Sequence, residues 1–432
     1  MLNRFLWGLT TFFVTIVCVG QVLSALPTAQ ANDKSIFELT RLHKIGITLS
    51  RAEWDVLQTS DARIGNMAGA ASAAGTDYTR SDGRLIHVGS GFRGFFPWVH
   101  ADMRVNGIDF KDVGLRYKGN LSFMSSSAAA PFRANLKVKT DLFEGKTDWS
   151  GVETLNLHAG VLDSSLMREA LGFALFRAAG VPASRTAYAE ITFNVPGLYT
   201  EARGGMYTLI ENVNKQFLKN ALPPGTGLLF KPEGTPGGIT SRGNSWSQYI
   251  PTFRPDREAT PEEQKRVMEF ADLVSQPDVA LFRSKIGTYL DVDEFLRYIA
   301  VNSFLQNWDS YLTGNHNYYF YLDPKDNKIR FIPWDLDLSA GGRMGGPGNV
   351  GDMMRPFIGN NPLIYWLLDD PAVAERYRAI IKELSKTVFA RTEIEKIIVE
   401  LEKANPERDP SLRSFVDSRV SYVQGLIAGW EK

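Results

Sequence analysis

The sequence contains a single cysteine, Cys18, which lies in an apolar N-terminal stretch. A chain with one thiol forms neither an internal disulfide nor a metal site built on cysteines, so its stability must come from a hydrophobic core. Lys plus Arg and Asp plus Glu number 48 each, and this balance gives no sign of a nucleic-acid partner. We therefore expect a globular protein that binds no nucleic acid.

Three common enzyme motifs are also missing. The five histidines do not show the His-Glu-x-x-His spacing of zinc hydrolases. The sequence has no Gly-x-Ser-x-Gly nucleophile elbow and no Walker A phosphate-binding loop. Any catalytic site in this sequence is therefore expected to be built from carboxylates, amides and lysines.

The first 31 residues have the order of a secretory signal. Arg4 provides a positive charge, Phe5–Leu26 is mostly apolar, and Ala29-Gln30-Ala31 offers the small residues that a signal peptidase accepts. We predict cleavage after Ala31 and a mature protein that is secreted, periplasmic or held in the cell envelope. The alternative is an uncleaved membrane anchor, because the apolar run is just long enough to span a bilayer. No later segment reaches about 18 consecutive apolar residues, so we expect no stable transmembrane segment after cleavage.

Hydrophobic periodicity and turn chemistry predict most strands in the first half of the chain and most helices in the second. Strands are expected at 45–49, 103–117 (a hairpin that turns at Asn106-Gly107), 134–140, 187–195 and 205–210, with helices at 51–57, 163–179 and 214–222. Later helices are expected at 261–275, 293–305, 361–368, 371–387, 391–403 and 410–430, with a hairpin formed by 318–322 and 329–333. Segments rich in glycine, proline or small residues are predicted to be loops: 59–96, 122–130, 223–258 and 341–351.

This order predicts an α+β protein with a strand-rich N-lobe, a helical C-lobe and a cleft between them. The expected boundaries are 1–31 for the signal peptide, 32–100 for an N-terminal strand and helix with a flexible loop, 101–213 for the N-lobe and 214–432 for the C-lobe.

Polar residues suited to catalysis gather around the predicted hairpin 318–333. Asp309 follows a helix, Asn317 leads into the first strand, and Asp335 follows the second strand. A hairpin folds back on itself, so Asn317 and Asp335 should lie at the same end, where their oxygens would suit Mg²⁺ or Mn²⁺. Asp309 could then accept a hydroxyl proton, which is the arrangement that phosphoryl transfer uses. Taken one at a time, each residue is also explained as a cap or turn residue.

A phosphoryl-transfer site also needs cations from the strand-rich half, and these are present. Arg133, Lys137 and Lys139 are expected on one face of the strand 134–140. Glu169 shares its side of the next helix with apolar residues, and a carboxylate in such company normally has a partner. The loop Lys118-Gly119-Asn120 could present backbone N–H groups to a phosphate.

Several motifs occur together in an order that resembles one known family. They are Arg116-Tyr117-Lys118-Gly119-Asn120, the lysine-rich strand 133–141, Gly180-Val181-Pro182-Ala183, Met206-Tyr207, Glu211-Asn212-Val213, Tyr289-Leu290-Asp291, Asn307-Trp308-Asp309-Ser310, His316-Asn317-Tyr318-Tyr319 and Pro333-Trp334-Asp335-Leu336-Asp337. The sequence resembles the spore coat protein H (CotH) kinase family from about residue 45 to the C-terminus, and the last three motifs are the specific ones.

The resemblance implies an atypical protein-kinase-like fold that uses ATP and Mg²⁺ or Mn²⁺ to phosphorylate secreted or envelope proteins on serine. It implies that Asp309 is the catalytic Asp, and that Asn317 and Asp335 hold metal, with Asp337 as a neighbour that could share it. It further implies a Glu169 ion pair, a hinge at 207–217 that includes Glu211, and a phosphate-binding cation that is Arg133, Lys137 or Lys139, of which we favour Lys137.

The sequence departs from the family pattern at two positions. Leu121 replaces the first of two small hydroxyl residues after Gly119-Asn120, and Arg133 stands where lysine is common. A secreted serine/threonine protein kinase is the leading hypothesis. The alternatives are a surface-binding protein or adhesin that retains the fold, or the same fold transferring AMP or phosphorylating a sugar.

Overall fold

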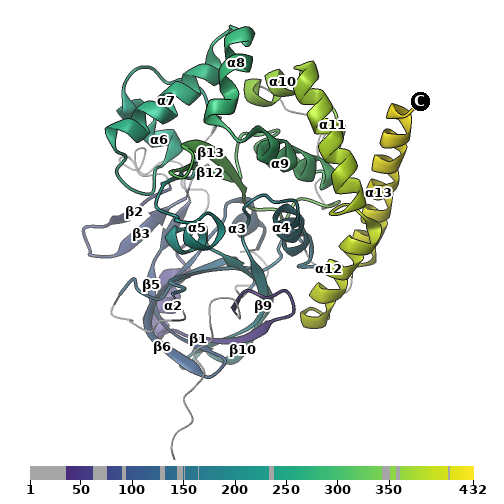
Figure 1. Ribbon diagram of the computed structural model, residues 1–432. Helices are drawn as coiled ribbons and strands as arrows, with labels where there is room; N and C mark the ends of the chain where they lie inside the picture. The colour runs from purple at the N-terminus through teal and green to yellow at the C-terminus, as the bar shows by residue number, and fades with distance from the viewer. Residues whose placement is uncertain are drawn as a thin grey trace, which may run out of the picture. The chain divides into compact units, whose positions relative to one another are not determined.

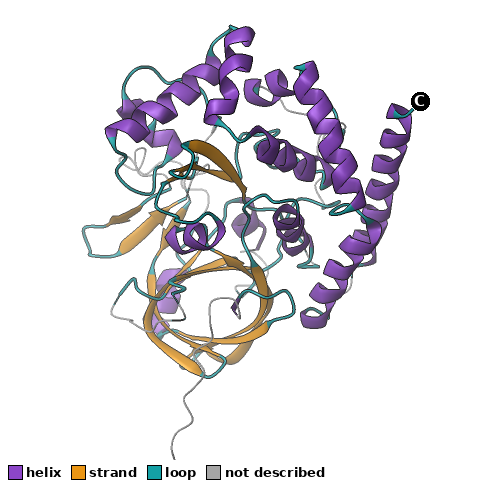
Figure 2. Ribbon diagram, in the orientation of Figure 1, coloured by secondary structure: helices purple, strands orange, loops and turns teal. Residues whose placement is uncertain are grey.

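Seven β-strands of the first half of the chain form a closed barrel in the order β1-β5-β6-β7-β8-β10-β9. They are β1 (Leu42–Thr48), β5 (Val99–Val105), β6 (Ile108–Tyr117), β7 (Leu136–Lys139), β8 (Thr154–His158), β9 (Thr186–Val195) and β10 (Tyr199–Glu211). β1 closes the barrel because it pairs antiparallel with β5 and parallel with β9. Figures 1 and 2 show the barrel viewed along its axis.

The computed structural model describes residues 36–61, 75–89, 94–126, 132–143, 149, 151–163, 165–232, 238–342, 351–356, 361–406 and 409–432. The expected signal peptide, residues 1–31, lies outside the described residues, as do parts of the predicted loops. All of the described residues belong to one unit, Ala31–Lys432.

The hairpin predicted at Asn106-Gly107 is confirmed. β5 and β6 pair from Val105 with Ile108 onward, and the two turn residues have φ of 50° and 90°. Both values lie in the left-handed region, which is what a two-residue turn requires if it is to match the twist of its strands.

The predicted loop 59–96 is wrong over part of its length. It contains β2 (Asp77–Thr79), β3 (Leu85–Val88) and β4 (Phe95–Pro97), which form a three-stranded sheet. Ile86 and Phe96 are fully buried. The burial of these two apolar side chains stabilises short strands in a segment whose many small residues are typical of a loop. Likewise, α3 (Leu121–Ser126) replaces the start of the loop predicted at 122–130, with Phe123 buried.

The helices are α2 (Arg51–Leu57), α4 (Arg168–Ala178), α5 (Lys215–Ala221), α6 (Ile250–Phe253), α7 (Pro261–Ser275), α8 (Val279–Tyr289), α9 (Val292–Phe304), α10 (Pro362–Leu368), α11 (Pro371–Lys386), α12 (Arg391–Ala404) and α13 (Pro410–Trp430). A second three-stranded sheet contains β11 (Leu228–Phe230), β12 (Tyr318–Asp323) and β13 (Lys328–Pro333). Helix α8 was not predicted from the sequence. The loop predicted at 223–258 is wrong in part, because it contains β11, α6 and a 3-10 helix (Trp246–Gln248).

Two hydrophobic clusters stabilise these elements. One includes Leu115, Leu157 and Leu209 from the barrel strands, and the other includes Phe173 of α4 and Phe304 of α9. The α+β class is therefore confirmed, whereas the division into two lobes stays a prediction. Among the described residues, none of the helices combines the length and the apolar character that crossing a bilayer requires.

Buried Arg419 on α13 fixes the end of α9, the helix that leads to Asp309. Its guanidinium donates to the carbonyl oxygens of Phe304 (3.0 Å), Ser303 (3.1 Å) and Gly351 (2.6 Å). Carbonyls in the last turn of a helix have no partner within the helix, so a buried side chain that satisfies them holds the helix end in place. Arg419 is only 5% exposed, and water cannot easily take over this role.

We expect Arg419→Met to lower the free energy of unfolding by about 2–4 kcal/mol, because the buried carbonyl groups of Phe304 and Gly351 lose the guanidinium that donates to them. Chemical denaturation followed by circular dichroism measures this change. The control is Lys396→Met, which removes a 70% exposed ammonium that pairs with Glu393 and should change stability by less than about 0.5 kcal/mol. Equal losses in the two variants would contradict the role of Arg419.

Candidate active site

The end of the β12–β13 hairpin brings Asn317 next to the residues that precede Asp335. Tyr318 pairs with Pro333, and the Trp334 N–H donates to the Asn317 carbonyl at 3.1 Å. Asn317 and Asp335 have φ of 55° and 56°. Asn and Asp tolerate this left-handed conformation better than most residues, which explains their presence at the two exits of the hairpin.

Asp309 lies in direct contact with Asn317. The Asn317 side-chain amide donates to Asp309 Oδ2 and to the Asp309 carbonyl, both at 2.9 Å. The amide nitrogen is thereby committed to Asp309, so the amide oxygen is the Asn317 atom that would face a cation. Asn307 and Ser310 shape this loop, since Ser310 Oγ donates to the Asn307 carbonyl at 2.7 Å.

The other oxygen of Asp309 accepts a hydrogen bond from His316 Nε2. A side chain on Gly314 would collide with this ring, because a Cβ there would lie 2.0 Å from His316 Cε1. Glycine at 314 is therefore required for His316 to reach Asp309. Both carboxylate oxygens of Asp309 are held, and the group is fixed in orientation.

Glu169 is buried, and its partners come from three separate elements. His158 Nδ1 at the end of β8 lies 2.8 Å from Glu169 Oε2, and the Leu336 N–H approaches Glu169 Oε1 at 3.4 Å. Lys118 Nζ, just after β6, lies 2.6 Å from His158 Nε2. Burial raises the pKa of Glu169 and lowers the pKa of Lys118, and the attraction between the two groups opposes both shifts.

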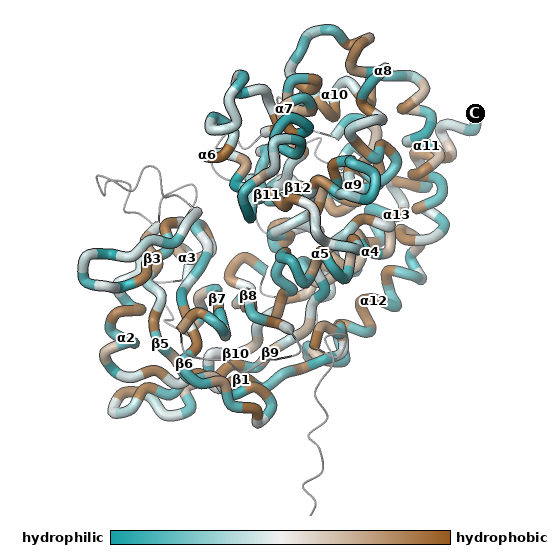
Figure 3. The backbone as a smooth tube through the Cα atoms, turned by 60° about the vertical axis from the view of Figure 1, so that its left-hand side comes forward, coloured by the Kyte–Doolittle hydropathy of each residue, from teal (hydrophilic) through white to brown (hydrophobic). Residues whose placement is uncertain are grey.

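Helix α4 can approach the Asp335 segment closely because it has glycine at 172. A Cβ on Gly172 would lie 2.9 Å from Leu336 Cδ1. Glu169 stands one turn earlier on the same helix and therefore meets the Leu336 backbone. α4 also packs against α9 and α12 (Figure 3).

Asp335 and Asp337 lie partly buried among other carboxylates. Burial raises the pKa of Asp335, and the nearby carboxylate of Glu169 raises it further. Burial also raises the pKa of Asp337, as do the charges of Asp335 and Glu169. His158, Glu169 and Asp335 each offer an atom within 4.8 Å of the others, in an arrangement that could hold a metal ion. Crowded oxygen ligands of this kind fit a divalent cation, which would offset their mutual repulsion.

Lys137 and Lys139 share one face of β7, but Arg133 does not join them. Lys137 Nζ lies 3.5 Å from Asn212 Oδ1 rather than beside Glu169. Arg133 precedes the strand and donates to the Ala159 carbonyl at 3.1 Å. The strand begins at Leu136, so the alternation assumed for the face does not extend back to 133. Lys118 is thus the lysine that the structure brings to Glu169.

Lys137 lies in a strongly positive environment. Burial lowers its pKa, and the charges that add most to this shift are Arg116, Lys231, Lys118 and Lys139. All four are cations. The repulsion between these cations and Lys137 would decrease if an anion bound among them.

The predicted loop Lys118-Gly119-Asn120 connects β6 to α3. Gly119 has φ of 95°, and a Cβ on it would lie 2.2 Å from Ser122 Oγ, so this tight turn requires glycine. The Lys118 N–H is already bonded to the Asn135 carbonyl at 2.9 Å.

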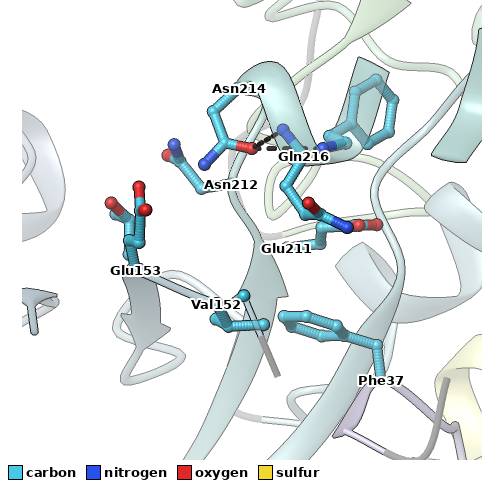
Figure 4. Close-up of a pocket in the computed structure, with 10 residues that line it drawn as sticks. Phe37, Val152, Glu153, Glu211, Asn212, Asn214 and Gln216 are labelled. Carbon is cyan, nitrogen blue, oxygen red and sulfur yellow. Dashed lines mark hydrogen bonds between the residues drawn. The ribbon is translucent and has the colours of Figure 1, made fainter. Parts of the chain in front are cut away.

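Glu211 ends β10 and is paired with Arg185. Arg185 Nη2 lies 2.6 Å from Glu211 Oε1, and its Nε and backbone N–H also donate to this carboxylate. A pocket lies beside the segment 211–217, with Glu211, Asn212, Gln216, Val152 and Phe37 among its lining residues (Figure 4). The Glu211 carboxylate is therefore committed to an ion pair at the edge of this pocket.

The family model described as CotH kinase protein matches residues 115–413. The chain belongs to the CotH kinase family. The match begins near the end of β6 and includes Lys118, Glu169, Asp309, Asn317 and Asp335. The resemblance inferred from the sequence motifs is thereby confirmed.

Curated relatives of this CotH family member include proteins of a bacterium and a fungus. Inner spore coat protein H of Bacillus subtilis is 24% identical over 61% of this chain and 71% of its own length. Invasin CotH7 and spore coat protein homolog 1 of Rhizopus delemar are 23% and 22% identical, each over 52% of this chain. The match spans only 38% and 37% of the two Rhizopus proteins.

Among solved structures, the comparison finds a Shewanella oneidensis complex of the toxin–antitoxin proteins HipA and HipB with operator DNA. The TM-score is 0.30 with 14% identity, over 64% of this chain and 57% of that one. A likeness of this size supports no conclusion about the fold of the CotH family member.

Sequence reasoning missed His158, Arg116 and Lys231 as parts of this site. His158 lies on β8, which was not predicted. The segment 154–158 does alternate, with Leu155 and Leu157 separated by Asn156, and this pattern is the signal that would have identified a strand with polar residues on one face.

The pKa of His316 provides a test of its contact with Asp309. Burial lowers this pKa, but the hydrogen bond and the charge of Asp309 outweigh burial and raise it. In metal-free protein, we expect Asp309→Asn to lower the pKa of His316, because burial then acts without the charge of Asp309. An NMR titration of the imidazole signals measures this, with buried His43 as an internal control that should not change. An unchanged His316 pKa would contradict the contact.

Proposed function

We propose that the protein is an exported, ATP-dependent kinase that phosphorylates serine or threonine of secreted or envelope proteins. The observation that carries this proposal is the gathering of Asp309, Asn317 and Asp335 at one end of a hairpin, with Lys118 from the barrel beside them. Lys118 Nζ lies 5.3 Å from the centre of the Trp334 ring, and the charge of Asp335 acts on the pKa of Lys118. Membership of the CotH kinase family supports the proposal.

The proposed reaction assigns a different task to each side of the site. Asp309, held by Asn317 and His316, orients the acceptor hydroxyl and takes up its proton. The hydroxyl oxygen attacks the γ-phosphorus of ATP, the bond from that phosphorus to the β-phosphate oxygen breaks, and ADP leaves. Lys118 and Lys137 hold the phosphates from the barrel side. The amide nitrogen of Asn317 holds the Asp309 carboxylate, and the Leu336 N–H after Asp335 holds Glu169. These contacts fix the positions of the acidic residues relative to the two lysines.

The residues fit Mg²⁺ or Mn²⁺, since Asn317, Asp335 and Asp337 offer the oxygen ligands that such ions prefer. When bound there, the metal would neutralise charge that develops on the phosphate oxygens. We propose that the segment 207–217 contacts the base, because Asn212 joins the pocket in Figure 4 to Lys137. The boundaries 32–100, 101–213 and 214–432, the signal 1–31 and an extracellular location remain part of this proposal. The spore coat protein and the invasin among the relatives are consistent with that location.

Phosphoryl transfer tests this function directly. The chain from residue 32 is incubated with labelled ATP, Mn²⁺ and a generic protein acceptor, and label on the acceptor is measured. We expect Asp335→Asn and Asp309→Asn each to reduce transfer by about 100-fold or more, because the first removes a proposed metal ligand and the second removes the proposed base. Asp369→Asn is the control, because Asp369 is exposed and pairs with Arg283 on the surface. Absence of transfer by the wild type with every acceptor and metal would reject the proposal.

Nucleotide binding separates a kinase from a surface-binding protein with the same fold. ATP with Mn²⁺ should raise the thermal midpoint, since a ligand at about 100 times its Kd stabilises a protein by about 2.7 kcal/mol. Lys137→Met should reduce this shift, because one of the buried cations is lost. Lys325→Met, in the exposed hairpin turn, should retain it. A thermal midpoint that does not change when ATP and Mn²⁺ are added would favour the alternative of a surface-binding protein.

A further inference from the structure

His158 occupies the position between Lys118 and Glu169 where kinases need a cation and a carboxylate to be connected. Its Nε2 lies 2.6 Å from Lys118 Nζ, and its Nδ1 lies 2.8 Å from Glu169 Oε2. The Leu336 N–H reaches the other oxygen of Glu169 at 3.4 Å. One chain of polar contacts therefore joins the end of β6, the end of β8, α4 and the segment after β13.

The direction of the hydrogen bonds in this chain is fixed by chemistry. An ammonium group has only donors, so His158 Nε2 accepts from Lys118. The ring proton is then on Nδ1, which donates to Glu169. Burial and the charge of Lys118 lower the pKa of His158 to about 3, so the ring is neutral and can accept at one nitrogen while donating at the other.

The surroundings restrict the ammonium further. The Lys118 Nζ lies 5.3 Å from the centre of the Trp334 ring, and the His158 ring meets Trp334 edge-on with centroids 6.3 Å apart. Lysine has a long and flexible side chain, so it needs such contacts to hold its charge at one point.

We propose that His158 is a positioning residue that bridges Glu169 and Lys118 and thereby fixes the lysine ammonium for the phosphates of the nucleotide. This inference rests on the proposed kinase function. In this arrangement the connection between carboxylate and lysine passes through an uncharged imidazole, and the positive charge stays on Lys118.

A metal ion held by His158, Glu169 and Asp335 is the competing use of the same atoms, which lie within 4.8 Å of one another. Both ring nitrogens of His158 are already partnered, and Lys118 carries a positive charge to the position next to Nε2. A metal ligated by this ring would have to displace one of these partners, so the contacts favour the bridge.

Three variants test the bridge by steady-state kinetics with ATP. His158→Leu fills a similar volume but makes neither hydrogen bond, and we expect kcat/KM for ATP to fall about 10- to 100-fold, as for other groups that orient a functional side chain. His158→Gln has one acceptor and one donor and should recover most of this loss. The KM for the acceptor protein should stay unchanged in both. His43→Leu removes another buried, hydrogen-bonded histidine that lies outside the site and should cost stability without changing kcat/KM.

A double-mutant cycle separates positioning from general damage. In a Lys118→Met background, His158→Leu should cause no further loss, because the ammonium it positions is absent. In a Lys137→Met background it should cause its full loss. Circular dichroism and thermal unfolding select variants that are folded. If His158→Leu does not fold, His158→Phe, which also makes neither hydrogen bond, replaces it in the cycle.

Each outcome decides between the possibilities. A wild type that transfers phosphate while His158→Leu matches its kcat/KM would overturn the bridge and leave the kinase function intact. Equal losses from His158→Leu in both lysine backgrounds would also overturn it. Coordination of Zn²⁺ by the His158 ring, detected by ¹⁵N NMR in nucleotide-free protein, would assign the residue to a metal site instead. A wild type that transfers no phosphate would instead reject the underlying function.

Discussion

The geometry of this site depends on one buried carboxylate. Glu169 is 3% exposed, and leaving a buried charge of this kind without partners costs about 3–5 kcal/mol. Its direct partners are His158 of β8 and the Leu336 N–H after β13, and His158 in turn connects it to Lys118, which follows β6. Satisfying Glu169 therefore requires the barrel, helix α4 and the acidic turn to lie together. The elements that carry the proposed chemistry are held in register by this requirement.

A second constraint acts on the backbone from the end of α9 to the segment that follows the hairpin. Gln306, Asn315, Asn317, Asp335 and Ala340 all have positive φ, between 50° and 56°. Such conformations cost free energy and persist where surrounding contacts determine them, which occurs most often at functional sites. Here those contacts are visible, since the Ala340 N–H bonds to the Leu305 carbonyl at 2.7 Å and Arg419 holds the end of α9. The backbone around Asp309 and Asp335 is thus fixed before any substrate arrives.

These constraints explain which parts of the site the sequence could predict. The proximity of Asn317 and Asp335 could be predicted because the turn residues identify a hairpin, and the register of a hairpin brings its two ends together. The partner of Glu169 could not, because strand alternation predicts which face a lysine occupies but not which lysine lies opposite a given helix. The family resemblance favours Lys137 as the phosphate-binding cation, whereas the lysine that the structure joins to Glu169 through His158 is Lys118, which follows the neighbouring strand. The strands β2, β3 and β4 have at most four residues each, too few for a pattern to stand out from a loop rich in small residues.

The charges around the site are separated by origin, and this separation bears on what can bind. The loop after α9, the segment after β13 and helix α4 contribute Asp309, Asp335, Asp337 and Glu169, while the barrel side contributes Arg116, Lys118, Lys137 and Lys139. Burial is the largest cause of the raised pKa of Asp335 and Asp337 and of the lowered pKa of Lys137, and like charges of the same group add to each shift. A small monovalent ligand would relieve only one side. A divalent cation carried by a polyphosphate would relieve both at once, because the cation meets the carboxylates and the phosphates meet the lysines. The repulsion within each group therefore supports the proposed binding of a metal–nucleotide complex without recourse to the sequence motifs.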